Sequence, residues 1–332
     1  MSDVVDLAVA LINTQSVSGS EQPMTSWLHN WFDREGFEVR RQHVADGREN
    51  IYAHLSKKPR LLFNSHIDTV PPFYPAHFEG ARLYGRGACD TKSLIAAQLL
   101  AAKELRAKGM DDFGMLYVVG EEVDHCGMVK ANELGLDPEF LIVGEPTESK
   151  LAQRQKGMLK LRLTAKGKMA HSGYPHLGVS AIAPMIDVLS DLHHADWPEE
   201  ATLGQTTLNT GLIQGGRAAN VVPDDCRAEL LVRVVTDHQS VLRQVRRIVA
   251  DRVHVEVIAG NDPTDLSVLP GWDTTIVAFN TDIPYFKFHG KAFLWGAGSI
   301  LDAHTDREFI EIADLEKAVD VYATLAEQLL AS

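Results

Sequence analysis

The chain has 332 residues, 45% of them hydrophobic, and 45 Asp and Glu residues against 32 Lys and Arg give a formal net charge of -13. A chain of this length can hold two domains, and its hydrophobic content can fill a sizeable core. The acidic balance argues against non-specific binding to nucleic acid or to anionic membranes, because both need a basic surface.

The N-terminal residues and the cysteines bear on the cellular compartment. Residues 1–16 lack the basic flank and the small-residue cleavage site of a signal peptide. No apolar run approaches the roughly 20 residues that a membrane span needs. Cys89, Cys126 and Cys226 form an odd, sparse set without a disulfide framework. We therefore expect a cytoplasmic protein without a membrane partner, and we interpret Cys89 and Cys126 as buried apolar filler.

Helical and strand patterns alternate from the N-terminus to about residue 150. Apolar residues recur at helical spacing in 3–15, and the aromatic stripe of a second helix, from Glu21, is typical of core. Segment 60–66 is apolar almost throughout, as expected for a strand buried on both faces. This alternation predicts a three-layer α/β/α sandwich. The other predicted elements are edge strands at 37–43 and 50–56, strands at 113–120 and 139–146, and helices at 92–108 and 127–135.

The pattern changes after Lys150. Residues 157–167 and 226–236 alternate between apolar and polar, which is typical of half-exposed antiparallel strands. Helices are predicted at 178–194 and 237–252. Together with a strand at 253–259, these elements predict a small α+β domain.

We expect this α+β domain, at 151–259, to be inserted into an α/β domain made of 1–150 plus 260–332. The α/β domain is predicted to resume with a helix over 274–279. A segment at 290–299 and a closing helix at 312–330 follow.

Polar residues stand at or just after the predicted buried strands. His66 ends the first of them, and Asp68 follows two residues later, so that in an extended chain both side chains point the same way. His66 can bind a metal ion while Asp68 orients the site from behind it. A single His-x-Asp pair is often incidental, so this pair gains weight only from its companions.

Glu121 and Glu122 follow the next buried strand side by side. Two adjacent carboxylates repel each other, and at the rim of a core they need a cation or solvent to compensate their charge. One of them can bind a metal ion while the other acts as general base on a water molecule. The alternative is a solvated turn, which is common for Glu-Glu pairs.

Three further candidates lie on other elements. Asp90 sits in GRGACDTKS, where glycines permit tight turns, and its alternative role is that of a helix N-cap. Glu145 ends another predicted strand, and Pro146 fixes the exit of the chain. His304, in LDAHTDREF, means little alone. Taken together, the two histidines and the carboxylates suit borderline ions such as zinc, cobalt or manganese.

Six segments in chain order resemble the family of co-catalytic zinc amidohydrolases, which includes acetylornithine deacetylase, succinyl-diaminopimelate desuccinylase, acetylcitrulline deacetylase and carboxypeptidase G. They are HIDTVPP, GRGACDTK, the Glu pair after a strand, GEP, HSGYPHLG and AHTDREF. The resemblance covers about residues 5–330, and the combination of motifs is specific where each alone is not. NTDIPYF and GKAFLWGAGSILDAHTDREF resemble the acetylornithine deacetylase branch most.

The resemblance implies a zinc-hydrolase catalytic domain and two zinc ions, with cobalt or manganese as alternatives. Asp90 matches the carboxylate that bridges both ions. His66 and Glu145 would complete one metal site, and Glu122 and His304 the other. The Asp90–Thr91 peptide is expected to be cis.

The resemblance also implies roles around the metal ions. Glu121 matches the general base, and Asp68 matches the residue behind the metal-binding histidine. The inserted domain resembles a ferredoxin-like lid and dimerisation domain. Its His171, in MAHSG, matches a histidine that reaches the partner subunit's active site and stabilises the oxyanion. Asn220 and Arg233 match residues that contact the substrate's carboxylate or carbonyl. The turn that lines the pocket would comprise Gly296, Gly298 and Ser299.

The implied activity is removal of the acyl group from an N-acyl amino acid. The nearest substrate is N-acetylornithine, or a related basic N-acyl amino acid of arginine or lysine biosynthesis. A hydroxide bridging the two ions would attack the amide carbonyl, and Glu121 would act as base and then as acid. We expect a homodimer formed through the lid domain, a small-molecule substrate and no nucleic-acid partner.

Other activities stay open. A succinyl-diaminopimelate desuccinylase, or a metallo-dipeptidase or aminopeptidase, would use the same ions on other amides. A non-catalytic binding relative would keep the fold without hydrolysis, and the full ligand set with Glu121 argues against it. A dinucleotide-binding α/β enzyme is suggested only by Gly85 and Gly87, since no helix-opening GxGxxG follows a strand.

Overall fold

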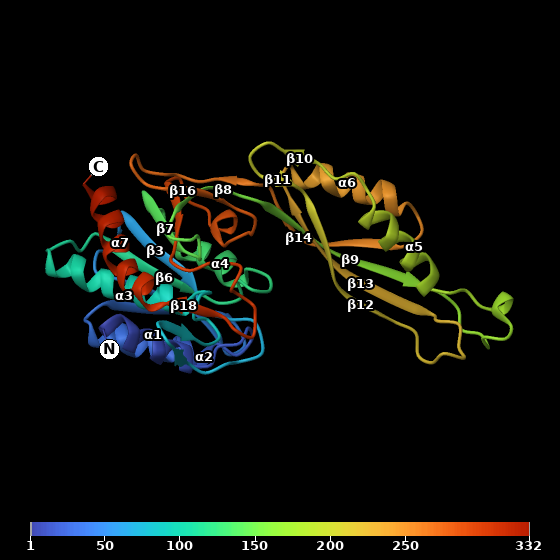
Figure 1. Cartoon of the computed structure of the whole chain (residues 1–332), viewed down its shortest axis with the longest axis horizontal. Coiled ribbons are helices and arrows are strands. Elements are labelled where there is room, and N and C mark those ends of the chain that lie inside the picture. Colours follow the sequence, from blue (N-terminus) through green and yellow to red (C-terminus); the bar gives the residue numbers. More distant parts are fainter. Residues whose placement is uncertain (1, 332) are drawn as a thin grey trace. The chain divides into compact units, whose positions relative to one another are not determined.

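The computed structural model of the chain describes residues 2–331, which fall into two units (Figure 1). The first unit contains the residues up to Gln153, Leu266–Thr275 and the residues from Thr281 onward. The second contains Arg154–Asp265 and Ile276–Asn280. The chain therefore leaves the first unit and returns to it. The roles expected for the domains at 1–150 plus 260–332 and at 151–259 stay predictions.

A six-stranded sheet forms the centre of the first unit. Its central strands β3, β6 and β7 are buried along their whole length, as the apolar runs of the sequence predict. β3 pairs in parallel with both β6 and β7, and β17 continues the parallel set, whereas β1, β2 and β6 pair antiparallel. In spatial order the strands are β1 (Glu38–Ala45), β2 (Arg48–His54), β6 (Phe113–Val118), β3 (Leu61–His66), β7 (Phe140–Gly144) and β17 (Lys291–Trp295).

Helices cover this sheet, and one apolar core joins them to it. α3 packs against both α1 and α7, while α4 contacts β1, β2 and β6 (Figure 1). Buried residues recur along one face of α1 and α7, which accounts for their helical spacing in the sequence. The predicted α/β architecture is thereby confirmed. The helices are α1 (Asp3–Asn13), α2 (Gln22–Arg34), α3 (Lys92–Ala107), α4 (Cys126–Ala131), the 3₁₀ turn η1 (Asn132–Leu134), η3 (Ile283–Tyr285) and α7 (Ile312–Leu330).

Two expectations for this unit are wrong. Segment 274–279, predicted as a helix, instead contains the strand β16 (Thr274–Val277), because its β-branched residues favour extended backbone. β2 is not an edge strand, since it lies between β1 and β6 and its central residues are buried. The chain also forms two small three-stranded sheets: one of β15 (Thr264–Asp265), β8 (Leu151–Gln155) and β16, and, in the first unit, one of β18 (Phe309–Glu311), β5 (Arg82–Tyr84) and β4 (His77–Glu79).

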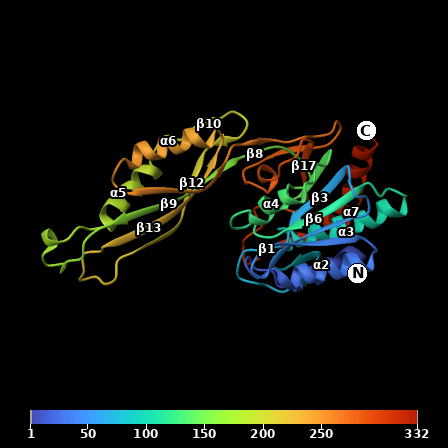
Figure 2. The same cartoon turned by 180° about the vertical axis from the view of Figure 1, so that it is seen from behind.

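The second unit is an antiparallel sheet with two helices on one face (Figure 2). Burial alternates along β9 and β13, as the sequence predicts, and the inward residues pack against α5 and α6. The edge strand β12 was not predicted, because most of its residues are exposed and it lacks apolar alternation. The strands in order are β12 (Thr207–Gly215), β13 (Asp225–Val234), β9 (Gly157–Lys166) and β14 (His254–Asn261); β10 (Glu199–Glu200) and β11 (Gly204–Gln205) form a hairpin, η2 is Pro175–Leu177, and the helices are α5 (Ile182–His193) and α6 (His238–Val249).

Candidate metal centre

Parallel strands bring the candidate residues of the first unit to one edge of the central sheet. His66 is the last residue of β3 and pairs with Val118, the last residue of β6. Glu121 and Glu122 lie in the turn that follows β6, and Glu145 directly follows β7. Because parallel strands end at the same edge, residues separated by about eighty positions converge there.

Asp90 lies at the centre of this cluster. Its Oδ1 is 2.9 Å from His66 Nε2, and its Oδ2 is 3.2 Å from His304 Nε2. His66 Nε2 is also 3.7 Å from an oxygen of Glu145, and His304 Nε2 is 3.0 Å from an oxygen of Glu122. The structure therefore brings together the five residues predicted as metal ligands, with each oxygen of Asp90 facing a different histidine.

The donor set fits divalent cations. One ligand atom from each of His66, Asp90 and Glu122 lies within 4.8 Å of the other two. His66 Nδ1 donates to the carbonyl oxygen of Asp68 at 2.9 Å, so Nε2 is the nitrogen left to coordinate an ion. Imidazole nitrogens with carboxylate oxygens are a ligand set of zinc and of related first-row ions.

Burial and close charged neighbours shift the pKa values of the side chains in this cluster. Burial raises the pKa of Glu145 and of Glu121 well above the usual range, with further increases from neighbouring carboxylates. Burial acts in the same direction on Asp90, but His304 and His66 outweigh it and hold the pKa of Asp90 low. Hydrogen bonds that His304 donates to the carboxylates of Asp90 and Glu122 raise the pKa of His304 to about 10. Burial opposes protonation of His66, yet Glu145 and Asp90 raise its pKa well above the ordinary value. Such a group of acids binds positive charge strongly.

Asp68 holds the turn that carries the two glutamates. Its Oδ1 accepts from the backbone N–H of Glu121 at 3.1 Å, and its Oδ2 accepts from that of Glu122 at 3.3 Å. Ser18 Oγ donates to the same carboxylate at 2.7 Å. The predicted contact with His66 runs through the backbone carbonyl of Asp68, while its carboxylate lies 3.7 Å from the ring. Asp68 thus connects the end of β3 to the turn after β6. Burial raises the pKa of the Asp68 carboxyl to about 6.

Glu308, which sequence reasoning missed, fixes the loop of Asp90. Its Oε1 accepts from the backbone N–H groups of Gly87, Cys89 and Asp90 at 2.9, 3.0 and 3.0 Å. Its Oε2 lies 2.5 Å from the guanidinium of Arg86, and both side chains are buried. The carboxylate therefore replaces the backbone partners that a tight loop lacks.

Asp90 does not cap the following helix. The N-cap of α3 is Thr91, and the Asp90–Thr91 peptide is cis, as the resemblance implies. Thr91 Oγ1 lies 2.6 Å from Ser65 Oγ and donates to the carbonyl oxygen of His66 at 3.1 Å. Side chains on both sides of the peptide thus connect Asp90 to the end of β3.

The predicted pocket turn, Gly296 to Ser299, follows β17. Gly296 N donates to Thr147 Oγ1 at 3.0 Å, just beyond Glu145, and a Cβ on Gly296 would lie 2.4 Å from the carbonyl oxygen of Glu145. Gly298 has a φ of 86°, and Cys89 Sγ donates to the carbonyl oxygen of Ser299 at 3.3 Å. The turn therefore lies against residues on both sides of the cluster, and this close approach requires glycine.

The remaining candidates lie in the second unit. His171 forms a bridge with Val221, and Ser172 N donates to the carbonyl oxygen of Asn220 at 3.0 Å, so His171 and Asn220 are neighbours. Asn220 precedes the start of β13, whereas Arg233 is near its end, opposite Met158. Eight strand residues span about 27 Å. The structure brings two of these three residues together and holds the third far from them.

The cysteines are free thiols, with Cys89 and Cys226 buried and Cys126 partly buried. Cys89 contacts the pocket turn, and Cys126 Sγ is 3.5 Å from the guanidinium of Arg48. Among residues 2–331, no helix combines the length and apolar character that crossing a membrane requires.

The chain is similar in sequence and in fold to known proteins. A family model described as a peptidase dimerisation domain matches residues 153–256. A peptidase M20 domain-containing protein of Schizosaccharomyces pombe is 37% identical over 333 residues, covering 96% of this chain and 83% of its own. A protein of Aspergillus clavatus named a probable carboxypeptidase is 36% identical over 366 residues, covering 96% and 81%. An M20 family metallo-carboxypeptidase of Sulfolobus solfataricus has a TM-score of 0.80 at 19% identity, covering 97% of this chain and 98% of that one. This last likeness concerns the fold alone.

Proposed function

Because the chain belongs to the M20 peptidase family, we propose that it cleaves the amide bond of N-acyl amino acids with a free carboxylate. This description covers both a deacetylase substrate such as N-acetylornithine and a carboxypeptidase substrate, since each is an amide of an amino acid with a free carboxylate. The relative from Aspergillus clavatus, named a probable carboxypeptidase, supports the peptide side of this range. The sequence resemblance supports the N-acyl side.

The observation that carries the proposal is the placement of Asp90 between two histidines. Its two oxygens face His66 and His304, and Glu145 and Glu122 lie beside those histidines. This arrangement supports two cation sites that share one carboxylate. Zinc, cobalt or manganese ions bound there would polarise the amide carbonyl and lower the pKa of an attacking water.

We assign the proton transfers to Glu121. It neighbours the cluster without being one of the five proposed ligands, and Asp68 fixes its backbone. Its carboxylate would accept a proton from the attacking water and pass it to the leaving amine, as a general base and then a general acid. The raised pKa of Glu121, caused first by burial, favours the second of these steps.

We propose that a homodimer completes the site. The match to a peptidase dimerisation domain over residues 153–256 supports two copies. Within one chain His171 bridges Val221 before the start of β13, whereas Arg233 lies eight residues beyond the first residue of that strand, a rise of about 27 Å, so one small substrate would not reach both from a single subunit. A second copy would supply the missing group, with His171 holding the oxyanion and Arg233 and Asn220 contacting the substrate's carboxylate or carbonyl.

We also propose a cytoplasmic location, which the three free cysteines support.

A substrate panel tests the proposal. Protein loaded with zinc, cobalt or manganese would be assayed on N-acetylornithine, N-succinyl-diaminopimelate, N-blocked dipeptides and free dipeptides. Each substrate would be paired with its C-terminal amide. We expect hydrolysis of N-acyl amino acids or N-blocked dipeptides and a large loss with every amide partner. Activity on free dipeptides alone would replace the proposal with a dipeptidase. Binding of substrate without hydrolysis under any metal would indicate a non-catalytic relative.

A further inference from the structure

The turn that carries Glu121 and Glu122 closes at His125. The carbonyl oxygen of Gly120 accepts from the backbone N–H groups of Asp124 and His125, at 3.0 and 2.7 Å. His125 is also the residue before α4. The turn is therefore held at its start by Asp68 and at its end by whatever fixes His125.

The backbone at His125 is left-handed, with a φ of 56°. This region favours glycine and disfavours a residue with a Cβ. The imidazole is nevertheless buried, with 4% of the residue exposed. A histidine at such a position needs contacts that offset the strain.

Two contacts fix the imidazole. Its Nδ1 donates to Asp282 Oδ1 at 2.9 Å, and its ring stacks on Tyr285 with centroids 4.1 Å apart and planes at 14°. The segment of Asp282 and Tyr285 is itself held, because Asn132 donates to the carbonyl oxygen of Tyr285 at 2.9 Å and accepts from Lys287 N at 2.7 Å. His125 thus connects the turn of the two glutamates to a firmly attached segment about 160 positions away.

The same nitrogen faces Glu121. His125 Nδ1 lies 3.8 Å from Glu121 Oε1 and 2.9 Å from Asp282 Oδ1, so one ring nitrogen lies close to both carboxylates. Side-chain exposure is 12% for Glu121 and 3% for Asp282, so both charges are poorly solvated and repel each other. A ring held by Asp282 therefore limits the positions open to the neighbouring Glu121 carboxylate.

We infer that His125 is a positioning residue for Glu121, acting through its hydrogen bond to Asp282 and its stacking on Tyr285. The inference rests on the proposed function of Glu121. It assigns no proton transfer to His125, whose task is to hold the base where it meets the substrate.

The main test replaces His125 with glycine and with asparagine. His125→Gly removes the ring and suits the backbone, so a purely structural role predicts unchanged turnover. Positioning predicts that kcat falls about 10- to 100-fold, because small displacements of a reacting group are costly. KM and bound metal should stay within about twofold, since ground-state binding is untouched. His125→Asn keeps an N–H donor near the position of Nδ1 and tolerates the left-handed backbone, so it should restore most of kcat.

A second variant and a matched control keep the test sharp. Asp282→Ala leaves Glu121 as the nearest acceptor of His125 Nδ1, so kcat should fall comparably even where His125→Gly fails to fold. In the double variant His125→Gly with Asp282→Ala, kcat should fall no further than in either single variant, because both substitutions remove the same contact. Ala250→Gly is the control: Ala250 also has a left-handed φ, of 51°, and lies in the second unit. This change should leave kcat intact.

A structural readout separates this inference from the proposed function. In crystal structures, the Glu121 carboxylate should be ordered in the wild type and in His125→Asn. In His125→Gly it should be displaced or disordered. An inactive wild-type enzyme would contradict the proposed function, while this comparison would still test the positioning. An unmoved Glu121 carboxylate in His125→Gly, full kcat in that variant, or additive losses in the double variant would each overturn the inference.

Discussion

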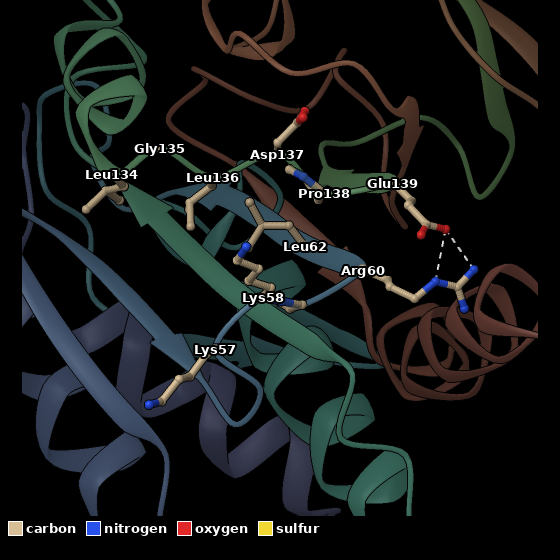
Figure 3. A pocket seen from close by; sticks show the side chains of 11 residues that line it. Lys57, Lys58, Arg60, Leu62, Leu134, Gly135, Leu136, Asp137, Pro138 and Glu139 are labelled. Atoms are coloured by element: carbon tan, nitrogen blue, oxygen red, sulfur yellow. Dashed lines mark hydrogen bonds and ion pairs between the residues drawn. The ribbon is translucent and has the colours of Figure 1, made fainter.

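The two ends of the central sheet both carry charged side chains, but they compensate these charges differently. At the amino ends of β3 and β7 lies a cavity of about 460 Å³, lined in part by Lys58, Arg60, Asp137 and Glu139 (Figure 3). Arg60 pairs with Glu139 at 2.7 Å, Asp137 lies 3.1 Å from His289, and Lys58 is exposed to solvent. Each charge at this end therefore meets an opposite charge or water.

At the carboxyl ends the carboxylates outnumber their partners and are buried. Asp90 and Glu145 are 6% and 5% exposed, and the cationic groups directly beside them are His66 and His304. Charges that are paired or solvated, as around this cavity, are stable without a ligand. Buried carboxylates without enough positive charge beside them need a bound cation to be stable. Uncompensated buried charge thus distinguishes the carboxyl end of the sheet, where the candidate site lies, from the amino end with its cavity.

The largest effect is expected from Asp90→Ala, which removes the carboxylate shared by both proposed metal sites. Bound metal should drop to background, and hydrolysis should fall to the uncatalysed rate, a loss of about a million-fold or more. Elemental analysis of the purified variant and a long-time assay measure this. Asp137→Ala, at the opposite end of the sheet, is the control and should keep full activity. Metal retained by Asp90→Ala would contradict the assignment of a metal site to the carboxyl end of the sheet.

Glu121→Gln should separate binding from chemistry at the carboxyl end. The amide is nearly isosteric but cannot accept the proton, so kcat should fall about 10²- to 10⁴-fold. Metal content should match that of the wild type, because Glu121 is not a proposed ligand. Parallel kinetics and elemental analysis test both statements. Loss of metal together with turnover would make Glu121 a ligand rather than the base.

Glu308→Ala should reveal how strongly the loop of Asp90 depends on one buried carboxylate. It leaves Arg86 and three backbone N–H groups without their partner, and breaking a buried ion pair costs about 3–5 kcal/mol of stability. Urea unfolding measures this change in free energy. Glu139→Ala, which breaks the exposed pair with Arg60, is the matched change and should leave the unfolding curve almost unmoved. Equal effects would mean that the two ends are not distinguished by burial.

Removal of metal by a chelator should destabilise the wild type and leave Asp90→Ala unaffected. An ion present at about a thousand times its dissociation constant stabilises the folded state by about 4 kcal/mol. Thermal unfolding with and without the chelator, and after zinc is restored, gives the shift. A chelator effect on Asp90→Ala equal to that on the wild type would place the stabilising ion elsewhere.

The smallest effect is expected from the double substitution Lys57→Ala with Lys58→Ala. Both lysines are exposed beside the cavity at the amino end and take no part in the candidate site. Turnover, metal content and unfolding should match the wild type, since such surface changes are usually neutral. A clear loss of activity would show that this cavity takes part in function.

The comparison also explains which residues the sequence could predict. His66 ends a buried apolar strand, and Glu121, Glu122 and Glu145 come after two others. Strand ends that share an edge converge by geometry. The roles assigned to Asp90 and His304 came from the resemblance, because a loop Asp and a lone His carry little signal alone. The predicted proximity of these residues is observed, while their roles as ligands stay predictions.

The supporting residues could not be predicted in the same way. Glu308 is 218 positions from Asp90, and His125 is 157 positions from Asp282. Their importance follows from hydrogen bonds that only tertiary structure creates. The helix predicted at 274–279 failed for a local reason, since its β-branched residues favour the strand β16 that they form. Sequence patterns therefore predict which residues lie at the strand ends. The contacts that hold those residues in place arise from tertiary packing.

The most direct test of the account is the anomalous diffraction of zinc-loaded crystals at the zinc absorption edge. We predict two peaks, one on each side of the Asp90 carboxylate, the first next to His66 and Glu145 and the second next to Glu122 and His304. No peak beside Asp90, or zinc only at the amino end of the sheet, would contradict the account.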